Sequence, residues 1–169
     1  GQRKELHVLR LARSGPEGAV RRKSFHYMNN ILGKWELAER TPSPRAEGVF
    51  LDAEGRLCEG IVSNLFWVSA GRLFTPSLDT GCLPGVTRGA VLALAARAGV
   101  PVCEGHFPVS ALASADEAFI TNSAQGLAPA EALYAADGAL LRRWDAASGE
   151  ITARMQDMYR KWTQSEGAP

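Results

Sequence analysis

Three apolar segments separated by short glycine-containing turns fill residues 48–78 and constrain the fold more than any other feature of the sequence. They read GVFLD, RLCEGIVSNLFWVS and RLFTPSL, and Gly55 and Gly71 lie in the two turns between them. Short runs rich in β-branched and aromatic residues, bounded by such turns, are typical of neighbouring antiparallel strands. We therefore expect residues 48–78 to form a three-stranded antiparallel meander.

The rest of the chain mixes strand and helix periodicity. Strands are predicted over residues 5–12, 100–107 and 117–123, and helices over residues 25–40, 87–98, 108–116 and 145–163. A loop is expected over residues 124–133 and a terminal hairpin over residues 134–141. Strands first and mixed helices later predict an α+β fold rather than a doubly wound parallel sheet.

The composition narrows the possible functions. The chain has 169 residues, enough for one domain with a core, and a net charge of +1 with no basic run among aromatic residues, so nucleic-acid binding is not indicated. No apolar run approaches the roughly 20 residues of a membrane span, and residues 1–10 do not resemble a signal peptide, so we expect a cytoplasmic location. Three cysteines without a C-x-x-C pair and three scattered histidines argue against a disulfide framework or a metal site.

Lys23 is the first candidate for chemistry. Only four of the 19 basic residues are lysines, and Lys23 lies where a short predicted strand passes into the helix predicted over residues 25–40. Unlike arginine, a lysine can lose its proton and act as a nucleophile or base, and the neighbouring charges of Arg21 and Arg22 favour the neutral amine. The ordinary alternative is a surface lysine beside two arginines.

Glu59 interrupts the apolar stretch LCEGIVSNLFWV. A carboxylate in such a strand either faces solvent or has a buried cationic partner, because an unpaired buried charge is costly. Asn64 follows five residues later, which places it on the opposite face of a regular strand unless a bulge intervenes. We expect Asn64 to support backbone geometry, and both alternatives for Glu59 stay open.

The stretch GCLPGVTRGAVLALA opens the helix predicted over residues 87–98 and has Arg88 in its first turn. Free N–H groups and the dipole at a helix start favour an anion such as phosphate, and Gly85 permits a close approach of the backbone. Many helices begin in this way without binding a ligand, so the stretch alone is a weak signal.

The stretch FITNSAQGLAP ends a predicted strand in three small polar residues, Thr121, Asn122 and Ser123. Their hydroxyl, amide and backbone groups offer donors to a second side of an anion. The alternative is an ordinary polar turn.

Together, in this order and spacing, these four segments resemble the large domain of the fold-type IV pyridoxal-phosphate enzymes. That family includes D-amino-acid and branched-chain aminotransferases and aminodeoxychorismate lyase, and the resemblance runs from about residue 20 to about residue 135. It implies the large C-terminal domain of the D-amino-acid aminotransferase-like fold, an α+β architecture with a mixed or antiparallel sheet curled as a pseudo-barrel and packed helices. It also implies pyridoxal 5′-phosphate as the cofactor.

The resemblance gives Lys23 and Glu59 the central roles. Lys23 of RKSFHYMNN resembles the catalytic lysine, which joins the cofactor covalently and then serves as the general acid and base. Glu59 of CEGIVSNLF resembles the carboxylate that pairs with the pyridine nitrogen of the cofactor.

The resemblance places the cofactor phosphate at two further segments. Val86 and Thr87 of PGVTR resemble the positions whose backbone amides bind it, and Asn122 and Ser123 of TNS resemble the second phosphate-side loop. Arg88 matches an arginine of the family with a structural role or a place near the cofactor.

Within the family, the sequences of the segments KSFHYMNNIL, EGIVSNLFWV and ITNSAQGLAPA are most similar to those of bacterial aminodeoxychorismate lyases. This similarity implies a folate-biosynthesis lyase that converts 4-amino-4-deoxychorismate to 4-aminobenzoate and pyruvate. The alternatives are a branched-chain or D-amino-acid aminotransferase and a non-catalytic fragment of such an enzyme.

The resemblance also bears on domains and partners. We expect residues 1–169 to form the single cofactor-binding large domain, with the small N-terminal domain of the family absent from this chain. The expected partners are a small-molecule substrate and a second copy of the chain in a homodimer.

Overall fold

A computed structural model of the chain describes residues 2–13, 28–145 and 149–165. The strands are β1 Lys4–Ala12, β2 Ala46–Leu51, β3 Leu57–Gly60, β4 Asn64–Ser69, β5 Arg72–Pro76, β6 Val102–Gly105, β7 Glu117–Asn122, β8 Gly126–Tyr134 and β9 Leu140–Arg143. The helices are α1 Met28–Arg40, α2 Val86–Arg97, α3 Val109–Ala113 and α4 Glu150–Ser165, with a short 3-10 helix over Leu78–Thr80. This mixture confirms the predicted α+β class.

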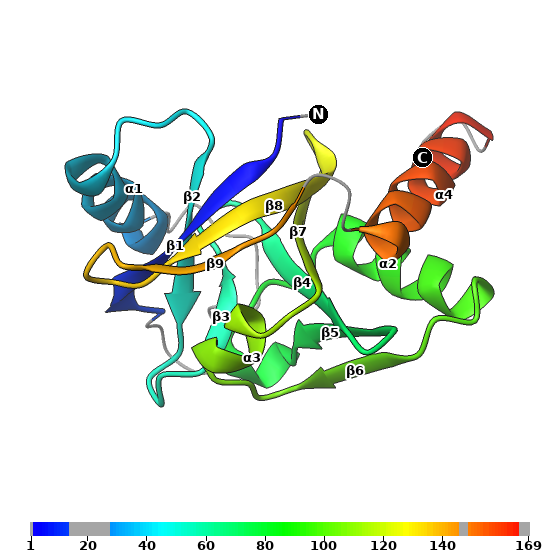
Figure 1. Ribbon diagram of the computed structural model, residues 1–169. Helices are drawn as coiled ribbons and strands as arrows, with labels where there is room; N and C mark the ends of the chain where they lie inside the picture. Colours follow the sequence, from blue (N-terminus) through cyan, green and yellow to red (C-terminus); the bar gives the residue numbers. More distant parts are fainter. Residues whose placement is uncertain (1, 14–27, 146–148, 166–169) are drawn as a thin grey trace.

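One curled sheet organises the molecule. Its strand order is β3-β2-β1-β8-β7-β4-β5-β6, with β9 paired to β8. β1 runs parallel to β2 and β8, β5 runs parallel to β6, and the other pairs are antiparallel. The two ends of the sheet meet where the Leu57 N–H of β3 donates to the Phe107 carbonyl after β6, at 2.8 Å. Figure 1 shows the curled sheet, with α1 on one side and α2 and α4 on the other.

The predicted three-stranded meander is wrong. β2 pairs with β3 and β4 pairs with β5, but β3 and β4 are not neighbours in the sheet. The strand expected over residues 56–69 breaks at residues 61–63, where Glu47 Oε1 accepts hydrogen bonds from the Val62 N–H at 3.1 Å and the Ser63 hydroxyl at 2.7 Å. A carboxylate from another strand thus stabilises a turn inside an apolar run, which the hydrophobic pattern cannot reveal.

The loop predicted over residues 124–133 is also wrong, because most of it belongs to β8. This strand changes partners at Pro129: residues 126–129 pair with β7, and residues 130–134 pair with β1. Proline has no N–H to donate, and a change of partner is a place where a strand tolerates it. The predicted hairpin is confirmed, since β9 folds back on β8.

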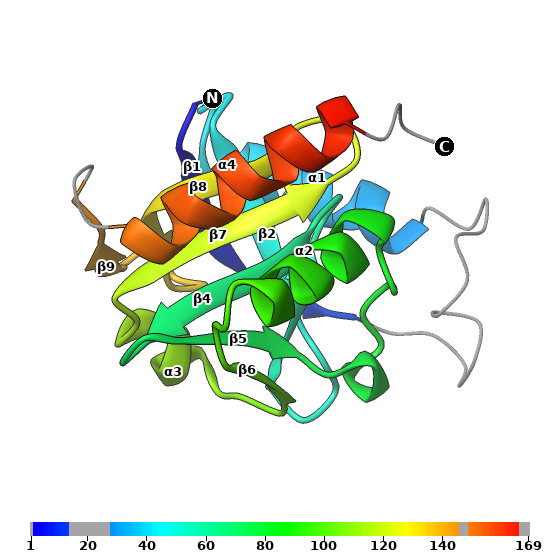
Figure 2. The same cartoon turned by 90° about the vertical axis from the view of Figure 1, so that its right-hand side faces the viewer.

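β4 separates the two main layers of the core, because its successive side chains point to opposite faces of the sheet. Leu65 and Trp67 join a cluster that includes residues of β1, β8 and α3. Phe66 and Val68 join a second cluster with residues of α2 and α4. Figure 2 shows these two helices lying across the strands on that second face. β4 is therefore buried on both faces, which explains why its sequence is continuously apolar.

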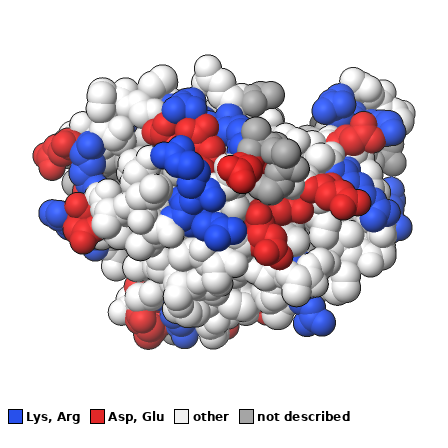
Figure 3. Space-filling view, in the orientation of Figure 1, with Lys and Arg blue, Asp and Glu red and all other residues white. Residues whose placement is uncertain are grey.

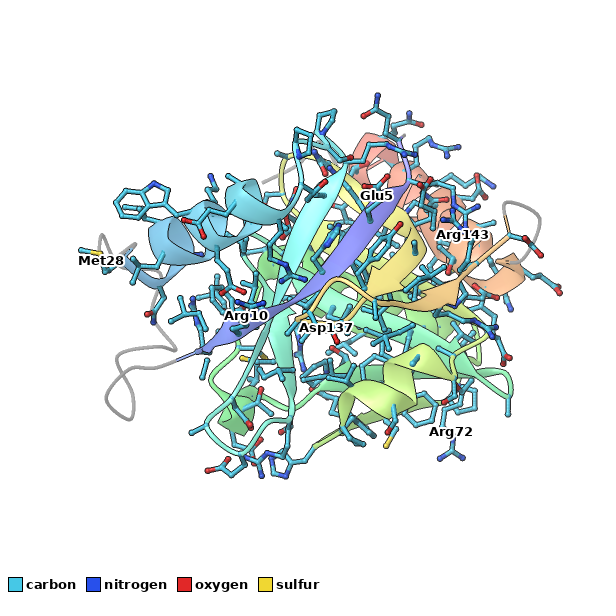
Figure 4. The ribbon with its side chains drawn as sticks, turned by 60° about the vertical axis from the view of Figure 1, so that its left-hand side comes forward. Glu5, Arg10, Met28, Arg72, Asp137 and Arg143 are labelled. Carbon is cyan, nitrogen blue, oxygen red and sulfur yellow. The ribbon has the colours of Figure 1, made fainter. Side chains whose placement is uncertain are left out.

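α1 lies against β1 and β2 through a glycine. A Cβ atom at Gly33 would lie 2.7 Å from Phe50 Cζ and 3.2 Å from Leu9 Cδ1, so the helix packs this closely only because the side chain is missing. Its other side exposes Met28 and Trp35, which are 63% and 65% accessible. Met28 projects away from the sheet in Figure 4.

The surface carries charges of both signs. Blue and red groups are interspersed on the face shown in Figure 3. Arg45, for example, contacts two carboxylates, Glu5 at 2.5 Å and Glu131 at 2.7 Å. No helix within the described residues is long and apolar enough to cross a bilayer.

Candidate functional site

Glu59 and Asn64 meet at the backbone of one residue, Leu83, although a regular strand would place them on opposite faces. The Leu83 N–H donates to Glu59 Oε2 at 2.8 Å, and Asn64 Nδ2 donates to the Leu83 carbonyl at 2.8 Å. The break at residues 61–63 makes this possible because it separates β3 from β4. The interruption that the sequence allowed for is therefore present.

The Glu59 carboxylate is buried and has a cationic partner. The residue is 4% exposed, and its Oε1 lies 2.9 Å from Arg13 Nη2. Burial raises the pKa of Glu59 above its usual value, while the charge of Arg13 and the Leu83 N–H oppose that rise. The solvent-facing alternative is excluded, and the buried ion pair is confirmed.

Arg13 is a site residue that the sequence analysis did not identify. Its Nη1 donates to Asn30 Oδ1 at 3.3 Å, and its guanidinium lies 5.5 Å from the centre of the Phe50 ring. Arg13 is separated from Glu59 by 46 positions in the sequence, so spacing gave no signal. The one available signal was the rule that a buried carboxylate needs a cation nearby.

The start of α2 is open. Gly85 precedes it in an extended conformation, and no side chain of the described residues forms a capping hydrogen bond there. A Cβ atom on Gly85 would overlap Asn64 Oδ1, so the backbone approaches Asn64 as closely as it does because residue 85 is glycine. Val86 is 79% exposed and Thr87 is 3% exposed. The N–H groups of this first turn are therefore available to an anion next to the Glu59 and Asn64 contacts.

The end of β7 lies beside this helix start. Thr121 of β7 is the cross-strand partner of Asn64, so the two side chains share one face of the sheet. Thr121 is 1% exposed, and its hydroxyl has no hydrogen-bond partner among the described residues. Asn122 Oδ1 accepts from the Ala124 and Gln125 N–H groups at 3.1 and 2.8 Å and so stabilises the turn, while Ser123 is exposed.

Arg88 is buried and connects α2 to the sheet. Its Nη2 donates to the Pro76 carbonyl at 3.0 Å and to Glu104 Oε2 at 2.5 Å, which ties the helix to β5 and β6. These contacts agree with the structural role considered for it. A contact with a cofactor stays a prediction, as it does for Val86, Thr87, Asn122 and Ser123.

Lys23 and the short strand expected before it lie outside the described residues, so their placement stays a prediction. No cluster of metal-ligating side chains occurs in the described part of the chain. Cys58 and Cys82 are buried beside Glu59, and burial raises the pKa of the Cys82 thiol to about 11 and that of the Cys58 thiol still further. Both thiols are therefore neutral and unreactive near pH 7.

Fold and site together define an α+β domain with a buried carboxylate beside an open helix start, which suits a ligand with a cationic end and an anionic end. The sequence profile of the family described as amino-transferase class IV matches residues 2–133. The chain belongs to this family, which confirms the resemblance found in the sequence.

The chain is also similar to individual proteins and solved structures of this family. The chain is 40% identical to the aminodeoxychorismate lyase of Bacillus subtilis over 158 residues, which cover 94% of this chain and 51% of that protein. The branched-chain aminotransferase of Thermoproteus uzoniensis superposes with a TM-score of 0.84 at 30% identity, covering 98% of this chain and 54% of that one. The PLP form of the branched-chain aminotransferase of Thermobaculum terrenum gives 0.83 at 27% identity, over 95% and 51%. The chain thus spans about half the length of the relatives it matches.

Proposed function

We propose that the chain acts as a pyridoxal-phosphate-dependent 4-amino-4-deoxychorismate lyase, which produces 4-aminobenzoate and pyruvate for folate biosynthesis. The observation that carries this proposal is the 40% identity to an aminodeoxychorismate lyase over 94% of the chain. The aminotransferase of Thermoproteus uzoniensis covers a similar share of the chain at only 30% identity.

The described residues fit pyridoxal phosphate. Its phosphate would bind the open first turn of α2 at Val86 and Thr87, with Ser123 on its second side and the unpartnered hydroxyl of Thr121 nearby. Its protonated pyridine nitrogen would bind Glu59. That carboxylate already forms an ion pair with Arg13 and accepts a hydrogen bond from the Leu83 N–H, and its oxygens have lone pairs left for another donor.

Two residues of this chain would perform the chemistry. When bound, pyridoxal phosphate supplies the electron sink for the bond that breaks at the carbon bearing the substrate amine. Lys23 Nζ would remove the proton from that carbon, the C–O bond to the enolpyruvyl group would break, and the released enol would take up a proton to become pyruvate. Glu59 would hold the pyridine nitrogen in its protonated form. Formation of an aromatic ring favours the products.

An amino-acid aminotransferase of the branched-chain or D-amino-acid type is the second candidate. The observation in its favour is the superposition on branched-chain aminotransferases over nearly the whole chain. The two activities require the same cofactor residues, so only the substrate separates them.

Two assays test the proposal. Incubation with pyridoxal phosphate, borohydride reduction and peptide mapping should give one adduct, at Lys23, that is lost in Lys23→Ala and kept in Lys34→Ala, since Lys34 is an exposed residue of α1. Aminodeoxychorismate should then yield pyruvate with the wild type and Lys34→Ala only. Pyruvate release that survives Lys23→Ala would overturn the mechanism. Glutamate formed from an amino acid and 2-oxoglutarate, without pyruvate release, would establish the aminotransferase.

We also propose that the 169 residues are the large cofactor-binding domain of a cytoplasmic homodimer, with a small domain contributing to the substrate pocket. The exposed apolar side of α1, with Met28, Ile31 and Trp35 at 63%, 42% and 65% accessibility, supports an interface there. Light scattering should give twice the monomer mass for the wild type and a lower mass for Trp35→Glu. A monomeric wild type would contradict the dimer.

A further inference from the structure

Arg13 contacts the carboxylate on which the proposed function depends. Its Nη2 lies 2.9 Å from Glu59 Oε1, and the two side chains are only 12% and 6% exposed. We propose that Arg13 is a positioning residue that keeps Glu59 ionised, so that Glu59 can hold the ring nitrogen of the cofactor in its protonated form. The inference rests on the proposed function for the identity of the ligand.

Burial alone would neutralise Glu59. A buried carboxylate without a partner takes up a proton rather than remain charged. In the described part of the chain Glu59 has two groups that favour its ionised form, the Arg13 guanidinium on Oε1 and the Leu83 N–H on Oε2. Only Arg13 carries a full charge. A neutral Glu59 would lack the charge that stabilises a pyridinium cation, so loss of Arg13 should be felt at the ring nitrogen.

Arg13 is itself held in place from several directions. Its backbone N–H donates to the Leu51 carbonyl at 2.7 Å, which fixes the end of β1 against β2. Its Nη1 donates to Asn30 Oδ1 at 3.3 Å on α1, and its guanidinium lies over the Phe50 ring. Asn30 also donates through Nδ2 to the Ile61 carbonyl in the break after β3. The charge is therefore oriented before any ligand binds, which is what a positioning residue requires.

Among the described residues, the other titratable groups that interact with Glu59 cannot replace Arg13. Cys58 precedes Glu59 in β3, and Cys82 precedes Leu83, whose N–H contacts the carboxylate; both interact with Glu59 electrostatically. Neither thiol carries positive charge in any state. Arg88 of α2 directs its Nη2 to Pro76 and Glu104 instead.

The first experiment follows Glu59 without cofactor. Carbon-13 NMR of the chain labelled at the glutamate carboxyl carbons, with the Glu59 signal assigned by its absence in Glu59→Gln, gives the titration midpoint directly. We expect an upward shift of that midpoint in Arg13→Met and a midpoint close to the wild type in Arg13→Lys. Arg45→Met is the matched control, because Arg45 pairs with Glu5 and Glu131 and not with Glu59. An unchanged midpoint in Arg13→Met would overturn the inference.

The second experiment follows the cofactor itself. Pyridoxal phosphate labelled with nitrogen-15 in its ring reports by NMR whether that nitrogen is protonated. The wild type and Arg45→Met should show the protonated signal at neutral pH, and Arg13→Met and Glu59→Gln should lose it. A chain with both Arg13→Met and Glu59→Gln should give the same ring-nitrogen signal as Glu59→Gln alone, because Arg13 acts through Glu59. If Arg13 were merely structural, Arg13→Met would keep the protonated signal wherever it binds the cofactor, and that result would overturn the inference.

The two experiments separate the possible failures. A wild-type chain that binds no pyridoxal phosphate overturns the proposed function, and with it the effect on the ring nitrogen, while the carbon-13 titration still decides whether Arg13 controls Glu59. A wild-type chain that binds the cofactor at Lys23, with no response to Arg13→Met in either experiment, overturns the Arg13 inference alone. If Arg13→Met does not fold, Asn30→Ala takes its place in the test, because it removes a contact that holds Arg13 in position. The titration midpoint of Glu59 in Arg13→Lys should then lie below the midpoint in Asn30→Ala.

Discussion

The two long helices on one face of the sheet begin in opposite ways. At the start of α4, the Glu117 carboxylate of β7 accepts hydrogen bonds from the N–H groups of Ile151 at 3.1 Å and Thr152 at 2.7 Å. At the start of α2, no side chain in the described part of the chain forms such a bond, and Val86 is exposed. Both helices contribute to the same apolar cluster, so they differ at their starts rather than in their packing.

This difference indicates a structural role for the start of α4 and supports the proposed binding role of the start of α2. The first N–H groups of a helix need acceptors, and a carboxylate also complements the positive end of the helix dipole. α4 receives its acceptor from the chain, although Glu117 lies 34 positions before Ile151. Among the described residues, no side chain provides such an acceptor for α2, which begins beside Asn64, Thr121 and the Glu59 contact with Leu83. The open start is the one that the proposed function uses for phosphate.

Removing the carboxylate at α4 should have the largest effect on stability. We expect Glu117→Ala to destabilise the chain by about 2–3 kcal/mol, because it leaves two N–H groups without their acceptor. Urea unfolding followed by circular dichroism measures this change. Glu150→Gln, which removes an exposed charge from the first turn of the same helix, should stay within about 0.5 kcal/mol of the wild type. Equal effects of the two substitutions would mean that Glu117 does not cap α4.

Filling the space at Gly85 should disturb the open start of α2. A Cβ atom there would overlap Asn64 Oδ1, so we expect Gly85→Ala to destabilise the chain by about 1–3 kcal/mol. Gly89→Ala is the matched control within the same helix, because its Cβ meets no atom within 4 Å. It should stabilise the chain by about 0.5–1 kcal/mol through helix propensity. Thermal unfolding of both variants decides the point, and the same sign of change in both would contradict it.

The sequence predicts the open helix start but not the closed one, because only the first is local. Gly85, Val86 and Thr87 are contiguous, and their pattern describes a helix start by itself. The cap of α4 depends on Glu117, whose contact with Ile151 exists only once β7 and α4 are packed. The same reason explains why Arg13 was missed, although Glu59 was identified.

The errors in the fold have a similar origin. Glu47 stabilises the break after β3 from a different strand, so the apolar run of residues 56–69 was predicted as one strand. Gly126 and Pro129 are typical of loops, but β8 contains both because it exchanges β7 for β1 at the proline. Helices with strong local patterns, such as α2, were predicted closely. Interactions between distant segments determine the parts of the fold that the sequence did not predict.

Inorganic phosphate should distinguish the two helix starts directly. If the start of α2 binds an anion, phosphate at ten times its dissociation constant should stabilise the wild type by about 1.4 kcal/mol. Gly89→Ala should keep this stabilisation and Gly85→Ala should lose it. Glu117→Ala, although less stable, should keep it as well, because α4 takes no part in binding. Unfolding temperature measured against phosphate concentration gives the answer, with chloride at equal ionic strength as the reference; equal protection by chloride would contradict a phosphate site.

The smallest expected effect concerns the slope of stability against pH. It tests whether Glu59, which contacts Leu83 just before α2, is held in its charged form. Burial raises the pKa of Glu59 in the folded state, so the folded chain binds this proton more tightly than the unfolded chain does. That contribution to stability is fully present below the ordinary carboxyl pKa and is lost as the pH rises through the folded-state value. Glu59→Gln removes the titration, so its stability relative to the wild type should rise as the pH rises above the ordinary glutamate pKa of about 4.3. Glu150→Gln should run parallel to the wild type. If the stability of Glu59→Gln also runs parallel to that of the wild type, Arg13 and the Leu83 N–H fully compensate the burial of the carboxylate. The ionised Glu59 that faces a ligand then carries no net penalty in the free energy of folding.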